Sequence, residues 1–141
     1  MKLIFILVIL SFFGCAKRVN SSSVIAYKKD VYEKISDVKI PGKSIVLQTY
    51  DNDDFFTFTT LKVDSLTLVN FVRSKKFKRR IDTEFPPLFF GAEELKDNKP
   101  DAKYRDYSYY LEGTKGKDNW LYIADIKRSL LWVEVIYVDK L

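Results

Sequence analysis

Alternating hydrophobic and polar residues predict several β-strands along the chain. Residues 44–50 and 55–63 are rich in β-branched and aromatic side chains, and the polar run 51–54 between them favours a turn. Three further segments of the same character lie at residues 103–111, 120–126 and 130–138. Residues 112–119, with Gly113 and Gly116, are expected to form the turn between the first two of these. Short connections of this kind join antiparallel strands.

One stretch between the strands has helical periodicity. Asp64 is suited to cap a helix over residues 65–77, in which Leu68, Phe71 and Val72 lie along one face. The predicted order is therefore β-β-α-β-β-β. This is an α+β fold of about five antiparallel strands with one main helix packed on the sheet.

Two shorter helices are also predicted. Asp30 and Glu33 have the spacing of a capping box, and the apolar residues that follow have helical spacing, so we expect a short helix that ends before Pro41-Gly42. After the proline-rich stretch that begins at residue 85, a short helix is expected at residues 92–96.

The last two strands have two faces of unequal polarity. On one, the alternation groups six apolar residues that are suited to the core: Leu121, Ile123, Leu131, Val133, Val135 and Tyr137. On the other it groups Trp120, Tyr122, Trp132 and Glu134, a set too apolar for an ordinary solvent face. We expect the N-terminal segment or the proline-rich loop to cover this set. The alternative is that its aromatic residues bind a partner.

The N-terminal residues have the pattern of an export signal. Lys2 precedes the apolar run 3–13, which is long enough for the apolar part of a signal peptide and too short to span a bilayer. Phe12-Phe13-Gly14-Cys15 follows and resembles the lipobox of bacterial lipoproteins, although Phe12 stands where that family usually has leucine. The resemblance covers only residues 1–16. It implies cleavage before Cys15 and attachment of lipid to that cysteine.

Lipid attachment would divide the chain into three parts. Residues 1–14 are the expected signal peptide, 15–23 are the lipidated cysteine and a polar tether, and 24–141 form one α+β domain. Two or more acyl chains anchor a protein stably, so the membrane is the first expected partner. We expect a location in the cell envelope, and in a Gram-negative host the periplasmic face of the outer membrane.

The composition limits the kinds of catalytic and metal-binding site that the chain can form. The chain has no histidine, and its single cysteine, Cys15, is the expected lipid acceptor, so histidine-based nucleophilic sites and ordinary zinc sites are excluded. Phosphate-binding and dinucleotide-binding glycine motifs are absent from the sequence. No cofactor or metal is expected, and an enzyme would have to work through carboxylates and tyrosines.

The formal net charge is +5, and the basic residues cluster in one segment. The segment "RSKKFKRR" contains the candidate patch residues Lys75, Lys76, Lys78, Arg79 and Arg80. Such a patch can contact anionic lipid headgroups or an acidic partner, or can be a solvated helix end that complements the helix dipole. A nucleic-acid partner is not expected, because an exported, lipid-anchored protein seldom meets nucleic acid and the sequence lacks the pattern of stacking residues along a basic groove.

These observations favour a non-enzymatic, membrane-anchored module that binds an envelope protein through its aromatic sheet face or through the loop Phe85–Phe90. A second hypothesis is an inhibitor or immunity protein directed against a toxin or hydrolase in the envelope. A third is a carboxylate-based hydrolase, which would need acids gathered in a concave pocket.

Overall fold

A single antiparallel sheet organises the protein. The structure, a computed structural model, describes residues 27–52, 55–84, 89–100 and 106–138. Within these residues six strands pair in the order β1-β2-β6-β5-β4-β3. Their bounds are β1 Ser44–Asp51, β2 Phe56–Val63, β3 Lys78–Arg79, β4 Ser108–Lys115, β5 Asp118–Asp125 and β6 Leu130–Ile136. The α+β class is confirmed, and the additional strand is the two-residue β3, which pairs with β4.

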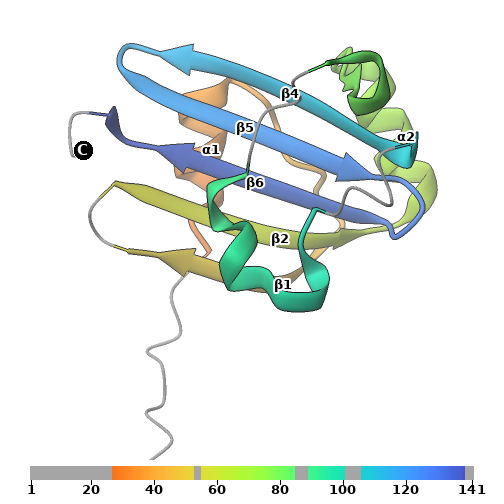
Figure 1. Cartoon of the computed structure of the whole chain (residues 1–141), viewed down its shortest axis with the longest axis horizontal. Coiled ribbons are helices and arrows are strands. Elements are labelled where there is room, and N and C mark those ends of the chain that lie inside the picture. Colours follow the sequence, from red (N-terminus) through yellow and green to blue (C-terminus); the bar gives the residue numbers. More distant parts are fainter. Residues whose placement is uncertain (1–26, 53–54, 85–88, 101–105, 139–141) are drawn as a thin grey trace, which may run out of the picture.

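Helical segments cover both faces of this sheet. In Figure 1 the helices α1 (Lys29–Ser36) and α2 (Ser65–Ser74) lie behind it, whereas the 3₁₀ helix η2 (Phe90–Asn98) crosses in front of β2 and β6. A second 3₁₀ helix, η1 (Arg80–Asp82), follows β3. The face behind the sheet and the face in front of it therefore each have an apolar core.

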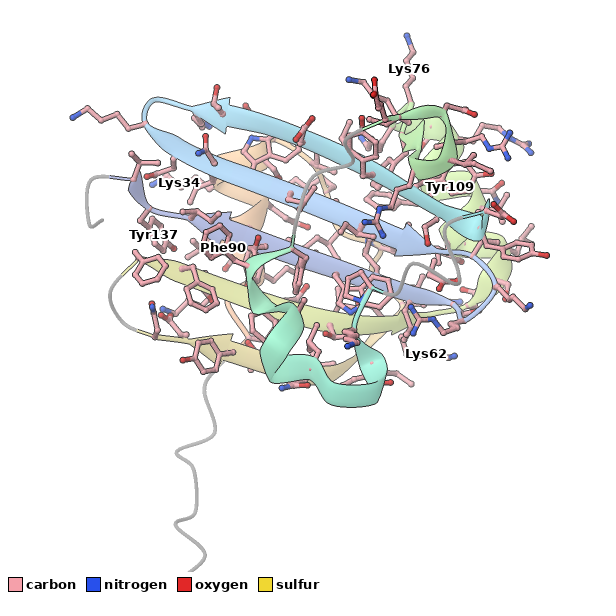
Figure 2. All side chains as sticks on the ribbon, in the orientation of Figure 1. Lys34, Lys62, Lys76, Phe90, Tyr109 and Tyr137 are labelled. Atoms are coloured by element: carbon pink, nitrogen blue, oxygen red, sulfur yellow. The ribbon has the colours of Figure 1, made fainter. Side chains whose placement is uncertain are left out.

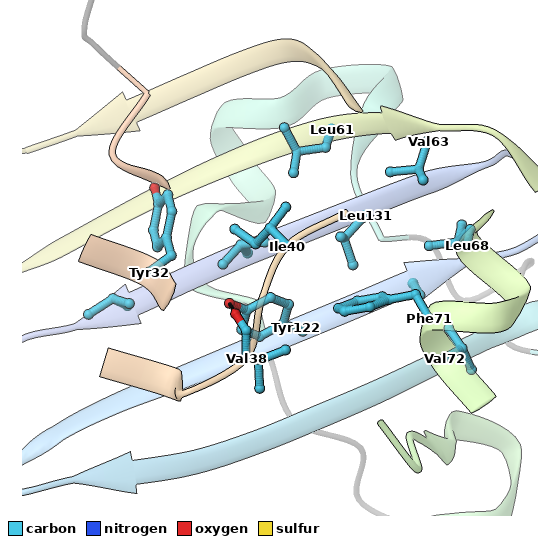
Figure 3. Close-up of a cluster of buried hydrophobic side chains, with 13 residues drawn as sticks. Tyr32, Val38, Ile40, Leu61, Val63, Leu68, Phe71, Val72, Tyr122 and Leu131 are labelled. Carbon is cyan, nitrogen blue, oxygen red and sulfur yellow. Dashed lines mark hydrogen bonds between the residues drawn. The ribbon is translucent and has the colours of Figure 1, made fainter. Parts of the chain in front are cut away.

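The core behind the sheet packs α1, α2 and the chain after α1 against the strands. Figure 3 shows its side chains, which include Tyr32, Val38, Ile40, Leu61, Leu68, Phe71, Tyr122 and Leu131. Two pairs of hydroxyl groups in this core are within hydrogen-bond distance of each other, whereas the buried hydroxyl of Tyr27, which packs against the same core, has no hydrogen-bond partner among the described residues. The Tyr32 hydroxyl lies 3.1 Å from the Thr57 hydroxyl, and the Ser36 hydroxyl lies 2.9 Å from the Tyr122 hydroxyl. Paired hydroxyls remove most of the cost of burying these groups and fix α1 on the sheet.

The core in front of the sheet is mainly aromatic. It contains Phe56, Phe58, Phe89, Leu95, Tyr110, Leu121, Ile123, Leu130 and Trp132. Gly91 allows η2 to approach the sheet closely, because a Cβ at this position would lie 2.3 Å from a ring carbon of Phe58. The other end of η2 is held by the Trp132 indole, whose Nε1 donates to the carbonyl of Asn98 at 2.8 Å. These contacts attach η2 to the strands.

Helix α2 begins as the sequence predicts and ends earlier. The Asp64 carboxylate accepts a hydrogen bond from the amide of Thr67 at 3.0 Å, which confirms the predicted N-cap. The helix ends at Ser74 rather than near residue 77, because Lys76 adopts a left-handed conformation with φ 57°.

The predicted capping box at the start of α1 is wrong. The helix begins at Lys29, and its N-cap residue, Lys28, makes no side-chain capping bond. Glu33 points instead to the chain beyond the helix, where its carboxylate accepts the amide of Ile40 at 2.8 Å and the ammonium of Lys39 at 3.0 Å. Glu33 thus secures the connection to β1 rather than the helix start.

The hairpin of β4 and β5 is longer than predicted. The expected turn at residues 112–119 is mostly strand, since Lys115 pairs with Asp118 and only two residues form the turn. Gly116 adopts φ 63° there, a conformation that favours glycine. Gly113 is a strand residue whose open side is filled by the Trp120 ring, 2.3 Å from an ideal Cβ position. The predicted short helix at residues 92–96 is part of the 3₁₀ helix η2.

The strand predicted at residues 103–111 begins only at Ser108, and residues 103–105 lie outside the described residues.

The prediction of which residues of β5 share a face of the sheet with which residues of β6 is also wrong. Tyr122 pairs with Val133, and Ile123 pairs with Trp132. Residues directly opposite each other in an antiparallel pair point to the same face. The Tyr122 side chain therefore joins Leu131, Val133 and Val135 behind the sheet, while Leu121 and Ile123 join Trp132 in front. Alternation within each strand was correct, but the turn between the strands sets their relative register.

Candidate functional site

The predicted aromatic face does not exist as one surface. Trp132 and Tyr122 are 0% exposed and point to opposite faces, Trp132 beneath η2 and Tyr122 beside α1. Trp120 is half-buried, and its ring packs edge-on against Tyr122 at 5.9 Å between centroids. The chain's own segments cover Tyr122 and Trp132, so these two side chains are not available to a partner. Coverage by the chain's own segments is the first of the two alternatives expected from the sequence, with α1 over Tyr122 and η2, which follows the proline-rich stretch, over Trp132. Periodicity alone could not show which segment covers which residue, because these segments are distant in the chain.

A groove in front of the sheet lies beside η2 on strands β4, β5 and β6. It has a volume of about 350 Å³ and is lined by residues that include Glu112, Thr114, Asn119, Leu121, Glu134 and Ile136. Leu121 on β5 pairs with Glu112 on β4 and with Glu134 on β6. Their side chains therefore belong to the same face of the sheet. The sheet thus brings two acids that are distant in the sequence to a common hollow.

Glu134 is the most unusual residue of this groove. It is 1% exposed, and its two carboxylate oxygens accept the backbone amides of Phe90 at 3.1 Å and of Gly91 at 2.8 Å. Burial raises the pKa of Glu134 to about 7, and the two amide hydrogen bonds partly oppose that rise. Figure 2 shows Phe90 at the start of η2, in front of the strands.

The geometry of Glu134 fits attachment of η2 better than catalysis. Both oxygens are occupied by amides, and little of the side chain reaches the open groove, so a substrate in the groove would contact the exposed Glu112 instead. We expected Glu134 on an aromatic face and did not single it out as a site. The available signal was one acid in the apolar strand sequence "LLWVEVI".

The basic segment lies at the end of the sheet where α2 passes into β3. Arg73, Lys75, Lys76, Lys78 and Arg79 are exposed, and Arg80 is half-buried. One acid of the same segment is close, since the Arg79 Nε lies 4.0 Å from the Asp82 carboxylate. Lys78 lies over the Tyr110 ring at 5.8 Å from its centroid. The structure therefore brings the predicted patch residues together on one end of the molecule.

Strand β1 forms the other edge of the sheet and exposes apolar side chains. Three consecutive residues, Ile45, Val46 and Leu47, are 68%, 40% and 46% exposed. The pairing with β2 is interrupted by a bulge between Val46 and Gln48. An edge strand keeps backbone amides and carbonyls that no neighbouring strand satisfies, so a second chain can add to it. We did not predict this surface, because the run reads as an ordinary buried strand in the sequence.

Several predicted features lie outside the described residues. These are the signal peptide, Cys15 with its tether, and residues 85–88 of the loop 85–90. In the described part of that loop, Phe89 is buried and Phe90 is exposed. Among the residues that the structure describes, no group of three or more His, Cys, Asp or Glu is placed to hold a metal ion. None of the helices in those same residues is both long enough and apolar enough to cross a membrane.

The chain was compared with models of known protein families, with curated proteins and with solved structures. None of the three comparisons found a match. Function is therefore argued from the surfaces themselves.

Proposed function

We propose that the chain is a lipid-anchored, non-enzymatic module of the bacterial cell envelope that binds an extended segment of another envelope protein. The observation that carries the proposal is the edge strand β1, with three consecutive exposed apolar residues. Apolar side chains of this size are costly to leave in water, at about 25 cal/mol for each Å². An added strand would pack against these side chains and hydrogen-bond along the edge of the sheet at the same time.

This location replaces the one expected from the sequence. The aromatic residues Tyr122 and Trp132 are buried, whereas β1 lies at the sheet edge opposite β3. Binding at β1 requires no rearrangement of the core, because the sheet merely gains one strand. The anchor at Cys15 supports the proposal in a different way, since tethering two partners to one membrane raises their effective concentration.

The experiment is a co-purification from detergent-solubilised membranes with a tag at the C-terminus. Ile45→Lys puts a charge on the exposed edge, and Ile81→Lys is the matched control, because Ile81 is 43% exposed and follows β3 at the opposite edge. A stoichiometric envelope protein lost only with Ile45→Lys is the expected result. Recovery of a toxin or hydrolase in that role would select the inhibitory form. Equal recovery with both variants would contradict binding at β1.

The anchor is tested separately. Replacing Cys15 by Ala removes the only thiol of the chain, so incorporation of labelled palmitate should stop and the protein should leave the membrane fraction. Continued labelling of the Cys15→Ala chain would refute lipid attachment at this residue.

The groove supplies an observation in favour of the hydrolase hypothesis, because Glu112 and Glu134 share one hollow. Two acids that face one hollow, one of them with a raised pKa, resemble the arrangement of a glycosidase pair. Against it stands the occupation of both Glu134 oxygens by amides. Hydrolysis of envelope polysaccharide that is abolished by Glu112→Gln would establish the enzyme, and its absence at all pH values would leave the binding module.

A further inference from the structure

A hollow at the α2 end of the molecule is separate from both β1 and the groove. It has a volume of about 330 Å³, and its lining combines apolar side chains, namely Val69, Phe77, Tyr109 and Ile126, with the two cations Arg73 and Lys76. The apolar residues are half-buried and the cations are exposed. Figure 2 shows Lys76 projecting outward at this end and Tyr109 beside α2. A ligand that fits such a lining has a negatively charged group next to an apolar part.

The cations around the hollow are available for such a ligand. Within the parts of the chain that the structure describes, no ion pair joins Arg73 or Lys76 to an acid. Lys75, between them in the chain, is exposed as well. Lys78 is exposed at the same end of the molecule, where its ammonium lies over the Tyr110 ring on the front face of the sheet. Residues 73–80 hold six basic residues and no acid, and Asp82, which follows them, lies 4.0 Å from Arg79.

The backbone at Lys76 gives an independent indication. Helix α2 ends in a Schellman motif, in which the amide of Phe77 donates to the carbonyl of Val72 at 3.1 Å and the amide of Lys76 donates to that of Arg73 at 3.2 Å. The residue at the left-handed position of this motif is usually glycine, because a side chain there is strained. Here it is Lys76, with φ 57°. The protein thus keeps a cation where folding alone favours glycine.

We propose that this hollow and its surrounding cations, Arg73, Lys75, Lys76 and Lys78, bind the headgroups of anionic phospholipids, so that the α2 end of the domain lies on the membrane. The phosphate pairs with Arg73 and Lys76, and the apolar lining contacts the glycerol and upper acyl region. The proposal deepens the proposed anchoring at Cys15, because it states how the anchored domain is oriented. It also leaves β1, at the far edge of the sheet, free to bind a protein.

The length of chain before the domain permits this orientation. Twelve residue steps separate Cys15 from Tyr27, where the described structure begins. A chain of that length reaches at most about 40 Å, which exceeds the roughly 26 Å length of an eight-residue strand. The anchor alone therefore does not fix which face meets the bilayer, whereas a cluster of cations on one end does.

The experiment is lysine footprinting of the full protein purified from membranes and reconstituted into vesicles. Modification by an amine-reactive reagent is followed by mass spectrometry in phosphatidylcholine vesicles with and without phosphatidylglycerol. Labelling of Lys75, Lys76 and Lys78 should slow at least about fivefold in the anionic vesicles, the factor expected from one cation near such a surface. Lys34 and Lys117, which are exposed elsewhere, serve as internal controls and should not change.

Two variants separate binding from folding. Lys76→Gly removes the cation and relieves the backbone strain, so the protein should remain folded while protection of Lys75 and Lys78 falls about fivefold. The double change Arg73→Gln and Lys76→Gln removes two cations, each expected to contribute about fivefold, and should abolish the protection of Lys75 and Lys78. The matched control, Lys34→Gln with Lys117→Gln, removes two exposed charges and should retain protection.

Three results would overturn the proposal. They are equal labelling in anionic and neutral vesicles, full protection in the Arg73 and Lys76 double variant, and protection in native membranes but not in protein-free vesicles. The last result would indicate an acidic protein instead. The same footprint with protein added to preformed vesicles does not depend on acylation. If the protein carries no lipid at Cys15, the proposed anchor is refuted. The footprint of protein added to vesicles would still test whether the hollow binds anionic lipid.

Discussion

The buried Glu134 makes a sharp prediction about stability and pH. Its pKa is raised from 4.5 to about 7 in the folded protein because the side chain is removed from water. Between these two values the folded protein holds the proton that the unfolded chain has released. Stability contributed by the neutral acid is therefore complete below pH 4.5 and is lost as the pH rises through 7.

The magnitude follows from the shift. A difference of about 2.5 units corresponds to roughly 3 kcal/mol, at 1.36 kcal/mol for each unit. Within the window the free energy of unfolding should fall by about 1.4 kcal/mol for each pH unit because of Glu134 alone. A loss of this size is a large fraction of the 5–15 kcal/mol that is typical of a domain.

The assay is urea unfolding at several pH values from 4 to 8, followed by the fluorescence of Trp120 and Trp132. Other groups also titrate, so the informative quantity is the difference between the wild-type protein and Glu134→Gln, which stays neutral throughout. The wild type should lose about 3 kcal/mol relative to the variant across the window. Glu112→Gln, at an exposed position in the same groove, is the control for removing one carboxylate from the groove.

The opposite slope would refute the reasoning. If the wild type gained stability over Glu134→Gln as the pH rises, the amides of Phe90 and Gly91 would stabilise the carboxylate more than burial destabilises it. A flat difference would show that Glu134 is exposed to water often enough to keep its ordinary pKa.

Three further changes test the packing and the helix ends. Gly91→Ala should destabilise the protein by about 1–3 kcal/mol in thermal or urea unfolding, because its Cβ would meet the Phe58 ring at 2.3 Å, whereas Gly42→Ala meets nothing within 4 Å and should be nearly neutral. A comparable loss at both glycines would contradict this. Asp64→Ala should cost about 1 kcal/mol in urea unfolding by removing the N-cap of α2, and no loss would show that the bond to Thr67 is dispensable. Lys76→Gly should raise the melting temperature, with a gain of up to about 1 kcal/mol from relief of the left-handed strain, and a decrease would contradict that strain.

Local features were predictable because they depend on neighbours in the chain. The strands, the order of elements and the N-cap at Asp64 follow from alternation and from one side chain that reaches an amide three residues away. The basic segment could be located because its cations are adjacent in sequence. The lipobox-like residues around Cys15 are likewise a local signal, and the anchor that they imply stays a prediction.

Features that join distant segments were not predictable in the same way. The length of the turn between β5 and β6 sets the register that places Tyr122 opposite Val133, and one residue more or less would exchange the faces. Whether Trp132 is exposed depends on η2, which is separated from it by about a third of the domain and is held there by Glu134 and Gly91. Whether β1 lies at an edge depends on which strands pair with which. The sequence of one strand does not specify its neighbours in the sheet.

The sequence by itself determined the α+β class, most of the secondary structure and the clustering of cations before β4, because propensity, capping and charge act over a few residues. Only the tertiary structure decided which aromatic side chains are buried, which strand is left at an edge, and that Glu134 meets two amides from a segment in front of the sheet. Burial and pairing depend on what covers a residue in space. The segments that do so lie tens of residues away along the chain.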